Sequence, residues 1–240
     1  MTSDRHSALQ AQPLPRSDPE YPGELDRALG NHAPGCYTLG HRKPLAQPLL
    51  ALFCSERCPG DLIIKACDVA TALRDAAVPV ISGFHSPVER ECLRILLRGT
   101  QPVIISLARS LERMRLPPDW RDPVRQGRLL LVSPFAAKQN RITAALADQR
   151  NEFVAALAHS VLIVYADPGG LIESLARKVR DWAKPLSTLE SSHASALRSL
   201  GAESVDTDSV VECWRKSAIA AMPPEKKNGC SARLQRQTNK

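Results

Sequence analysis

From residue 48 onward, short runs of apolar residues alternate with longer segments in which apolar and polar residues are mixed. The short runs have the length and composition of buried strands, and the mixed segments predict helices. The predicted strands are 49–55, 78–82, 102–107, 128–133 and 159–166, followed by a shorter strand at 185–189. The predicted helices lie near 61–77, 87–98, 138–158 and 170–183.

This alternation predicts the fold class. Strands that are apolar along their whole length are covered on both faces, and strands that alternate with helices are typical of a parallel sheet. We therefore expect an α/β protein with a Rossmann-like, doubly wound, mainly parallel sheet and helices on both faces. In such sheets ligands bind beyond the carboxyl ends of the strands, where the strand order reverses.

The rest of the chain divides into three regions around a domain at 45–190. Residues 1–20 are polar and contain proline, so we expect them to be disordered. Residues 21–44 are expected to be a short N-terminal appendage. Residues 191–240 are expected to be a flexible, basic C-terminal tail with one short helix at 208–221.

Composition narrows the class of protein. No apolar run is long enough to cross a bilayer, and the N-terminal residues contain no apolar secretory signal, so we expect a cytoplasmic protein without a membrane partner. The formal net charge of +7 is compatible with a polyanionic partner. Most of the seven cysteines lie in apolar segments, and nothing completes a zinc site around Cys54 and Cys58, so we expect neither a metal nor a cofactor.

Three predicted strands end in turns that are rich in small residues and precede a helix. They are "FCSERCPGD" at 53–61, "SGFHSP" at 82–87 and "YADPGGLIES" at 165–174. Free amides at the start of a helix favour an anion, and small residues let a phosphate approach the backbone. Chain reversal alone explains any one of these turns, but three turns at one edge of a sheet favour a crevice that recognises phosphate.

Arg150 and Asn151 are the fourth candidate, because they stand before an apolar helical segment that leads into the last strong strand. An arginine offers two donors to a phosphate, and an asparagine can cap the helix or contact a base or sugar. A solvated arginine followed by an ordinary helix cap is the alternative interpretation.

Several of these segments follow the order of motifs in a known family. The segment 21–40 resembles the "YP..L…PP..LY..G" start of the DNA-processing protein A (DprA/Smf) family, and "CSER" at 54–57 stands at its "GSR" turn. The later motifs "SGxAxGID", "RNRIIAGLSDxVLVVEA" and "SGSLxTAxxA" correspond to 82–89, 149–166 and 167–176. This family lies within a Rossmann-like nucleotide-binding superfamily that also contains the LOG phosphoribohydrolases.

The resemblance, which covers about residues 20–190, implies a protein that binds single-stranded DNA or a nucleotide without catalysis. It also implies a role in DNA uptake and recombination, with a recombinase as a partner, and leaves a homodimer open. The phosphate-binding residues that it implies are Ser55, Arg57, Ser82, Gly83, Arg150, Asn151, Gly169 and Gly170.

The chain departs from the family pattern in ways that weaken an anion site. Cys54 replaces the glycine of "GSR", and Glu89 replaces the aspartate of "GID". Glu152 replaces the second arginine of "RNR", so a positive charge expected to meet phosphate is reversed.

Two other functions therefore stay open. "DPGGLIESL" resembles the "PGGxGTxxE" motif of the LOG phosphoribohydrolases, in which case Glu173 would help to cleave an N-glycosidic bond. Leu171 and Ile172 replace the "GT" of that motif, and the helix dipole favours a glutamate in a first turn in any case. The other alternative is a module that senses a nucleotide without chemistry.

Overall fold

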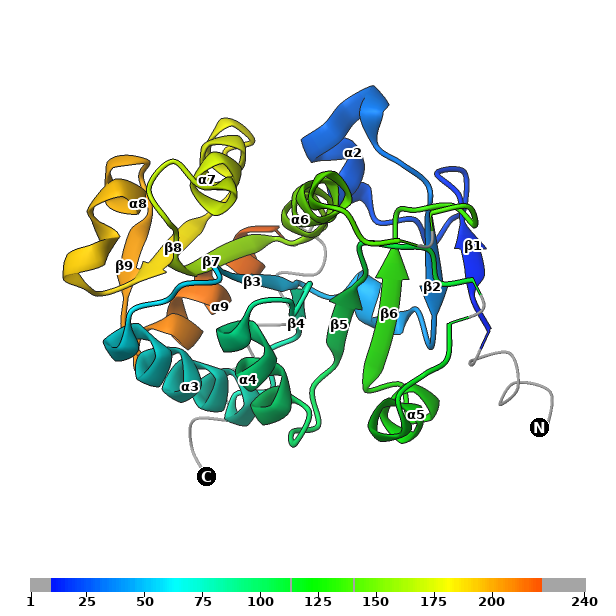
Figure 1. Cartoon of the computed structure of the whole chain (residues 1–240), viewed down its shortest axis with the longest axis horizontal. Coiled ribbons are helices and arrows are strands. Elements are labelled where there is room, and N and C mark those ends of the chain that lie inside the picture. The colour runs from blue at the N-terminus through cyan, green and yellow to red at the C-terminus, as the bar shows by residue number, and fades with distance from the viewer. Residues whose placement is uncertain (1–9, 113, 140, 222–240) are drawn as a thin grey trace.

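The computed structural model describes residues 10–112, 114–139 and 141–221. These residues form one nine-stranded sheet in the order β1-β2-β6-β5-β4-β3-β7-β8-β9 (Figure 1). β1 pairs antiparallel with β2, and β2 with β6, while all other pairs are parallel. The strands are β1 (Gln12–Leu14), β2 (Cys36–Leu39), β3 (Leu50–Cys54), β4 (Val80–Ser82), β5 (Val103–Ser106), β6 (Leu129–Ser133), β7 (Ser160–Tyr165), β8 (Leu186–Leu189) and β9 (Glu203–Val205).

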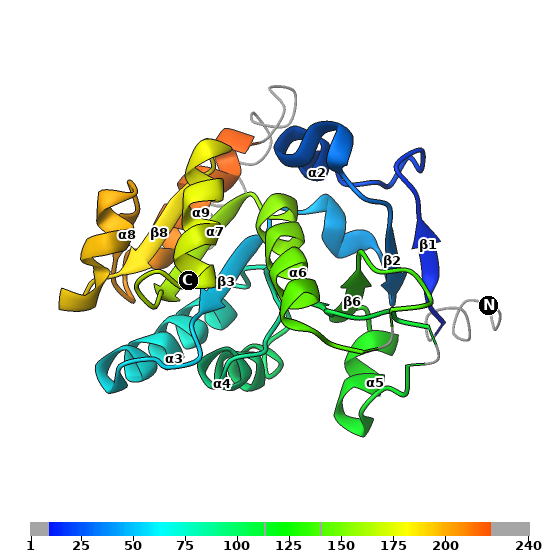
Figure 2. The same cartoon turned by 45° about the horizontal axis from the view of Figure 1, so that its top comes forward.

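Helices cover both faces of the sheet, as Figures 1 and 2 show. The first face carries α2 (Gly23–Leu29), α6 (Ala144–Leu157), α7 (Leu171–Asp181) and α8 (Ser195–Ser199). The second face carries α3 (Gly60–Asp75), α4 (Pro87–Leu96), α5 (Pro118–Arg125) and α9 (Val210–Ala221). Short 3-10 helices occur at Gly30–His32, Lys43–Ala46 and Ser192–Ala194. The predicted mainly parallel, doubly wound α/β class is confirmed.

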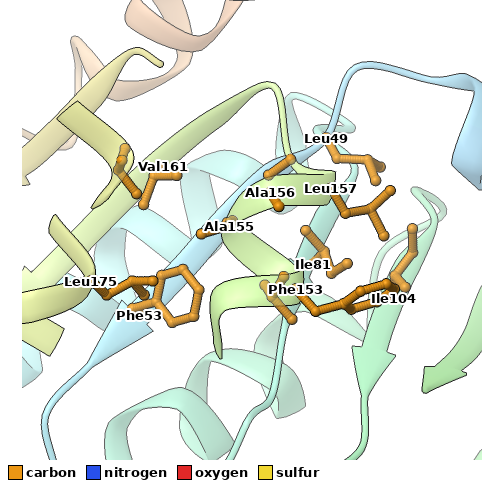
Figure 3. Close-up of a cluster of buried hydrophobic side chains, with 14 of the residues drawn as sticks. Leu49, Phe53, Ile81, Ile104, Phe153, Ala155, Ala156, Leu157, Val161 and Leu175 are labelled. Carbon is orange, nitrogen blue, oxygen red and sulfur yellow. The ribbon is translucent and has the colours of Figure 1, made fainter. Parts of the chain in front are cut away.

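The hydrophobic core has two halves because alternate side chains of a strand point to opposite faces. In β3, all five residues are buried. Phe53 packs on the first face together with Phe153 of α6 (Figure 3), while Leu52 packs on the second face with Leu62 of α3. Coverage on both faces explains why the strands read as continuous apolar runs.

The direction of winding reverses beside β3. The chain runs from β3 through β4 and β5 to β6, and then returns to the opposite side of β3 as β7. The carboxyl ends of β3 and β7 therefore flank the position where sheets of this kind bind ligands. None of the described helices is both long and apolar enough to cross a membrane.

The ends of the chain differ from the predicted division into regions. Within 1–20, expected to be disordered, Gln12–Leu14 form β1, and Leu14 is fully buried. Within the predicted appendage 21–44, β2 extends the sheet by pairing with β6. Within 191–240, expected to be a tail, β9 pairs with β8 and α9 follows it. Residues 1–9 and 222–240 lie outside the described residues.

Two helices on either side of β6 also differ from expectation. The helix predicted near 138–158 begins only at Ala144, where Thr143 accepts a hydrogen bond from the backbone N–H of Leu146. The sequence did not predict α5, which contains Pro123 and starts at Pro118. Proline is tolerated in the first turn of a helix, which fits Pro118, whereas Pro123 lies inside α5 and is usually read as a break.

Candidate functional site

A cavity of about 490 Å³ opens at the carboxyl ends of β3 and β7. Its walls come from the β3–α3 loop, the start of α4, the N-terminal half of α6 and the β7–α7 turn. The lining residues are Cys54, Ser55, Glu56, Arg57, His85, Ser86, Glu89, Ile142, Thr143, Ala144, Ala147, Arg150, Asn151, Asp167, Gly170, Leu171 and Ile172. The cavity thus lies where the winding of the sheet reverses, which is the place that the sequence predicted.

Arg150 is a buried cation in the wall of this cavity. Its side chain projects from α6, and the residue is 5% exposed. Nη1 donates a hydrogen bond to the carbonyl oxygen of Ser106 at 3.1 Å, and Nε donates to Oδ1 of Asn151 at 2.9 Å. Burial lowers the pKa of the guanidinium, and the nearby Glu89 opposes this shift. Arg150 therefore has a fixed position, and Asn151 helps to set it.

Gly83 makes room for Arg150. A Cβ atom on Gly83 would lie 1.9 Å from Nη1 of Arg150, so any side chain there would have to displace the guanidinium. Ser82 is fully buried, and its Oγ accepts a hydrogen bond from the backbone N–H of Phe84 at 3.1 Å. Ser82 and Gly83 do not line the cavity. Gly83 lies against the guanidinium of Arg150, whereas Ser82 holds the turn through Phe84, and contact of either residue with a phosphate stays a prediction.

Glu89 occupies the anion position that the turn before α4 creates. Oε1 accepts from the backbone N–H of Cys54 at 3.0 Å, while Oε2 accepts from His85 at 2.7 Å and from Ser86 at 3.4 Å. Oγ of Ser86 accepts in return from the N–H of Glu89, which completes a capping box. Desolvation raises the pKa of the buried carboxyl above its usual value. These amides are consequently bound to a carboxylate of the chain itself.

Glu173 has a similar role at the start of α7. Its Oε2 accepts from the backbone N–H of Gly169 at 2.7 Å, and its Oε1 pairs with Arg177. Gly169 adopts a φ of +70° that favours glycine and, like Glu173, lies outside the cavity lining. Gly170 lines the cavity. The geometry thus gives Glu173 a capping role instead of the catalytic role considered from the sequence.

The structure brings five of the eight predicted phosphate-binding residues to the cavity. They are Ser55, Arg57, Arg150, Asn151 and Gly170. Ser55 also connects two turns, because its Oγ accepts from the backbone N–H of Asp167 at 2.9 Å. Arg57 is exposed at the rim. The reversed charge at Glu152 does not face the cavity, since its carboxylate binds Nζ of Lys178 at 2.7 Å.

The apolar part of the wall was missed by sequence reasoning. Ile142, just before α6, and Leu171, at the start of α7, are 56% and 54% exposed, and both line the cavity. Large apolar side chains are normally buried, so an exposed pair beside a cavity indicates a surface for a ligand with apolar parts. No pattern in the sequence signals this wall, because an apolar residue near a helix start is usually core.

Metal binding finds no support among the residues that the structure describes. No cluster of three or more His, Cys, Asp or Glu side chains is placed there to hold an ion. The cavity contains charges of both signs, with Arg57 and Arg150 facing Glu56, Glu89 and Asp167.

Comparison with known families decides the relationship. The family model of DNA recombination-mediator protein A matches residues 12–202, which is most of the chain. The chain belongs to this family. The DNA recombination-mediator protein A region begins at the first residue of β1 and ends just before β9, so it includes the N-terminal strands that extend the sheet.

Solved structures show the same fold. DNA processing protein A from Helicobacter pylori, described for its single-stranded DNA binding mode, is 20% identical with a TM-score of 0.71, and the match covers 88% of this chain and 99% of that one. DNA processing protein A (DprA) from Streptococcus pneumoniae is 15% identical with a TM-score of 0.72, over 91% and 76% of the two chains.

A further solved structure is similar in fold. The molybdenum cofactor carrier protein of Chlamydomonas reinhardtii is 14% identical with a TM-score of 0.50, and the match covers 72% of this chain and 99% of that one. A comparison with curated protein sequences gives no match.

Proposed function

We propose that this member of the DNA recombination-mediator protein A family binds single-stranded DNA at the β3–β7 cavity, without catalysis, in DNA uptake and recombination. The observation that supports this best is the placement of two arginines on one cavity at the reversal of the sheet. Arg57 is exposed at the rim, and Arg150 is held by Ser106 and Asn151 in the wall. The relative from Helicobacter pylori, which has the same fold, binds single-stranded DNA.

The two arginines suit different parts of a nucleic acid backbone. Arg57 can bind a phosphate that stays in contact with solvent. The guanidinium is weakly hydrated, so removing water from it costs little free energy. Arg150 is already fixed, so a phosphate that meets its remaining N–H groups would not need to order the side chain. Ser55 and Gly170 leave room for the backbone beside them.

The apolar wall complements this charge. Ile142 and Leu171 offer surface to a sugar or base, while the proportion of aromatic residues in the chain is only 4%. Extensive stacking of bases on aromatic rings, which many single-strand binders use, is therefore a minor contribution. Binding that depends mainly on phosphate is expected to be sensitive to salt and tolerant of sequence.

A phosphoribohydrolase is not favoured. Glu173 is the residue that would cleave a glycosidic bond, but its carboxylate is bound to Gly169 and Arg177 and lies outside the cavity lining. Binding of a single nucleotide is the closest alternative, because a cavity of about 490 Å³ is in the range of small-molecule sites. The proposal also includes a recombinase as the protein partner, and it allows the protein to act as a homodimer.

The test is a fluorescence-anisotropy titration of a labelled single strand between about 50 and 200 mM salt. We expect affinity to fall steeply with salt, and we expect Arg57→Ala to reduce the slope of log K against log salt by about 0.7, the effect of one phosphate contact on a single strand. Arg94→Ala is the matched control, because Arg94 is an exposed arginine on α4 that pairs with Glu91 away from the cavity.

Three outcomes would count against this proposal. The first is the absence of binding at either salt concentration, and the second is an equal loss in Arg57→Ala and Arg94→Ala. The third is release of free base from a nucleoside monophosphate by the purified protein, which would return the enzyme alternative.

A further inference from the structure

Asp167 is an acidic residue in a cavity that otherwise suits an anion. It lies two residues after the end of β7 and lines the cavity together with Arg57 and Arg150. A carboxylate repels a phosphate bound nearby, so Asp167 opposes the contacts that the arginines offer to a nucleic acid backbone. Such a residue favours binding only where the ligand offers it a hydrogen-bond donor.

The other two carboxylates of the cavity are in different situations. Glu89 is buried and accepts hydrogen bonds from three backbone N–H groups of the turns around it. The side chain of Glu56 is 77% exposed and lies 3.9 Å from Nε2 of His85. Asp167 is partly buried, and no ion pair within the described part of the chain includes it. Of the three, Asp167 is therefore the acceptor best placed for a ligand.

The backbone of Asp167 is fixed on both sides. Its N–H donates to Oγ of Ser55 at 2.9 Å, and its carbonyl oxygen accepts from the N–H of Gly170 at 2.9 Å. The second bond closes a four-residue turn in which Pro168 and Gly169, with a φ of +70°, occupy positions that suit a type II turn. A Cβ atom on Gly170 would lie 3.2 Å from Cβ of Asp167, so the glycine keeps space open beside the acidic side chain.

The carboxylate of Asp167 keeps acceptor positions free beyond its neighbour Tyr165. Desolvation raises the pKa of the Tyr165 phenol, and the nearby charge of Asp167 adds to this rise. A phenol can donate one hydrogen bond, whereas a carboxylate offers about four lone-pair positions. Asp167 can therefore accept a hydrogen bond from a ligand while it stays beside Tyr165.

We propose that Asp167 recognises the bases of a bound single strand, with its carboxylate accepting a hydrogen bond from an exocyclic amino group. This inference rests on the proposed function. Within a DNA strand the phosphates and deoxyribose rings carry no hydrogen-bond donor, so the available donors are the N–H groups of the bases. Cytosine has an amino group at N4, from which acidic side chains accept. Thymine carries its one N–H between two carbonyl oxygens, which repel a carboxylate. The site is therefore expected to prefer cytosine to thymine.

The test is a pair of fluorescence-anisotropy titrations with labelled oligo(dC) and oligo(dT) of equal length, at neutral pH and constant salt. Both bases are pyrimidines on the same sugar, so the two strands differ little in size and backbone. We expect the natural chain to bind oligo(dC) about tenfold more tightly, which is the effect of one hydrogen bond to a charged group. Asp167→Asn keeps the shape of the side chain but removes its charge, and should make the two affinities nearly equal.

Glu56→Gln is the matched control for the loss of a negative charge. Glu56 also lines the cavity, but its side chain is mostly exposed. Removing its charge lessens the repulsion of the phosphates without touching the base contact. Both affinities should therefore rise alike, and the preference for oligo(dC) should stay.

Equal affinity of the natural chain for the two strands would overturn the proposal, and this comparison needs no substituted protein. An Asp167→Asn variant that binds both strands more tightly and keeps their ratio would also overturn it, since the carboxylate would then act by repulsion alone. Absence of binding to either strand contradicts the proposed function instead.

Discussion

At the scale of single residues, the guanidinium of Arg150 is the reason that position 83 requires a glycine. Its backbone touches the guanidinium of Arg150, so the glycine is required by a residue 67 positions later in the chain. Arg150 in turn donates to the carbonyl oxygen of Ser106 at the end of β5. One small residue thus allows a cation to be buried at the ligand edge of the sheet, where it can act on whatever enters the cavity.

Gly83→Ala should destabilise the protein by about 1–3 kcal/mol, because a methyl group would force the guanidinium out of its position. Urea unfolding measures this change. Gly23→Ala is the matched control and should cost nothing, since a Cβ there meets no atom within 4 Å. In a background of Arg150→Ala, the cost of Gly83→Ala should fall by at least about 0.5 kcal/mol. Additive effects of the two substitutions would contradict this account.

The sequence indicated the cavity's position but not all of its contacts. Ser55, Arg57 and Gly170 could be predicted because they follow parallel strands, whose carboxyl ends meet at one edge. The sequence could not show that Ser82 and Gly83 lie outside the cavity lining, because only the folded chain places the guanidinium of Arg150 against Gly83. The Ser86 and Glu89 spacing is that of a capping box, so the sequence did contain a signal that Glu89 would bind the turn.

At the scale of elements, α4 and α7 start in the same way. Each helix has a buried glutamate in its first turn that accepts hydrogen bonds from the backbone of the preceding turn. In α4 the carboxylate also accepts from Cys54 at the end of β3, so it joins two neighbouring turns. The two carboxylates therefore occupy backbone amides of the turns before these helices, and Arg57 and Arg150 are the cationic side chains that line the cavity.

Glu89→Gln should become less destabilising as the pH rises. The folded pKa of Glu89 is raised above its usual value of 4.5, so the folded state holds this proton more tightly than the unfolded state. The stability that Glu89 contributes is fully present below pH 4.5 and is lost as the pH rises through the folded pKa. Urea unfolding of both proteins from about pH 4 to pH 7.5 tests this. A difference between Glu89→Gln and the natural chain that grows with pH would contradict this prediction.

Elements were predictable where their own sequence decides them. The central strands are buried on both faces and read as apolar runs, so β3 and β7 were found almost to the residue. The edge strands β1 and β9 have three residues each and exist only through pairing with β2 and β8. So short a segment carries too little pattern to be separated from a loop.

At the scale of the whole molecule, a cluster of charged side chains joins α2 to the C-terminal end of α6, whose N-terminal half lines the cavity. Nζ of Lys184 donates to the carbonyl oxygens of Ala155 and Ala158 at the end of α6, at 3.2 and 2.5 Å. Glu24 of α2 lies 4.0 Å from the same Nζ and 3.6 Å from Nε2 of His159. This cluster connects α2, α6 and the strands β7 and β8 through buried charge.

Lys184 should make the protein more stable as the pH rises from about 8 to 10.5. Burial lowers its pKa from 10.5 to about 8, so between these values the unfolded state holds a proton that the folded state has lost. At about 1.4 kcal/mol for each pKa unit, the gain is about 3 kcal/mol. Urea unfolding over this pH range should show the rise in the natural chain, and Lys184→Met should remove it. An equal rise in both proteins would contradict this assignment.

The position of β3 has a consequence for how the protein is made. Its first parallel neighbour, β4, leaves the ribosome soon after it, but its other neighbour, β7, pairs Leu50 with Ser160 and follows about 110 residues later. Contacts between such distant segments form slowly, because the entropy cost of closing a long loop comes before the stabilisation from the contacts. Until β7 has been synthesised, β3 is therefore an unpaired edge strand beside exposed apolar surface. Chains in this state bind chaperones and are prone to aggregate.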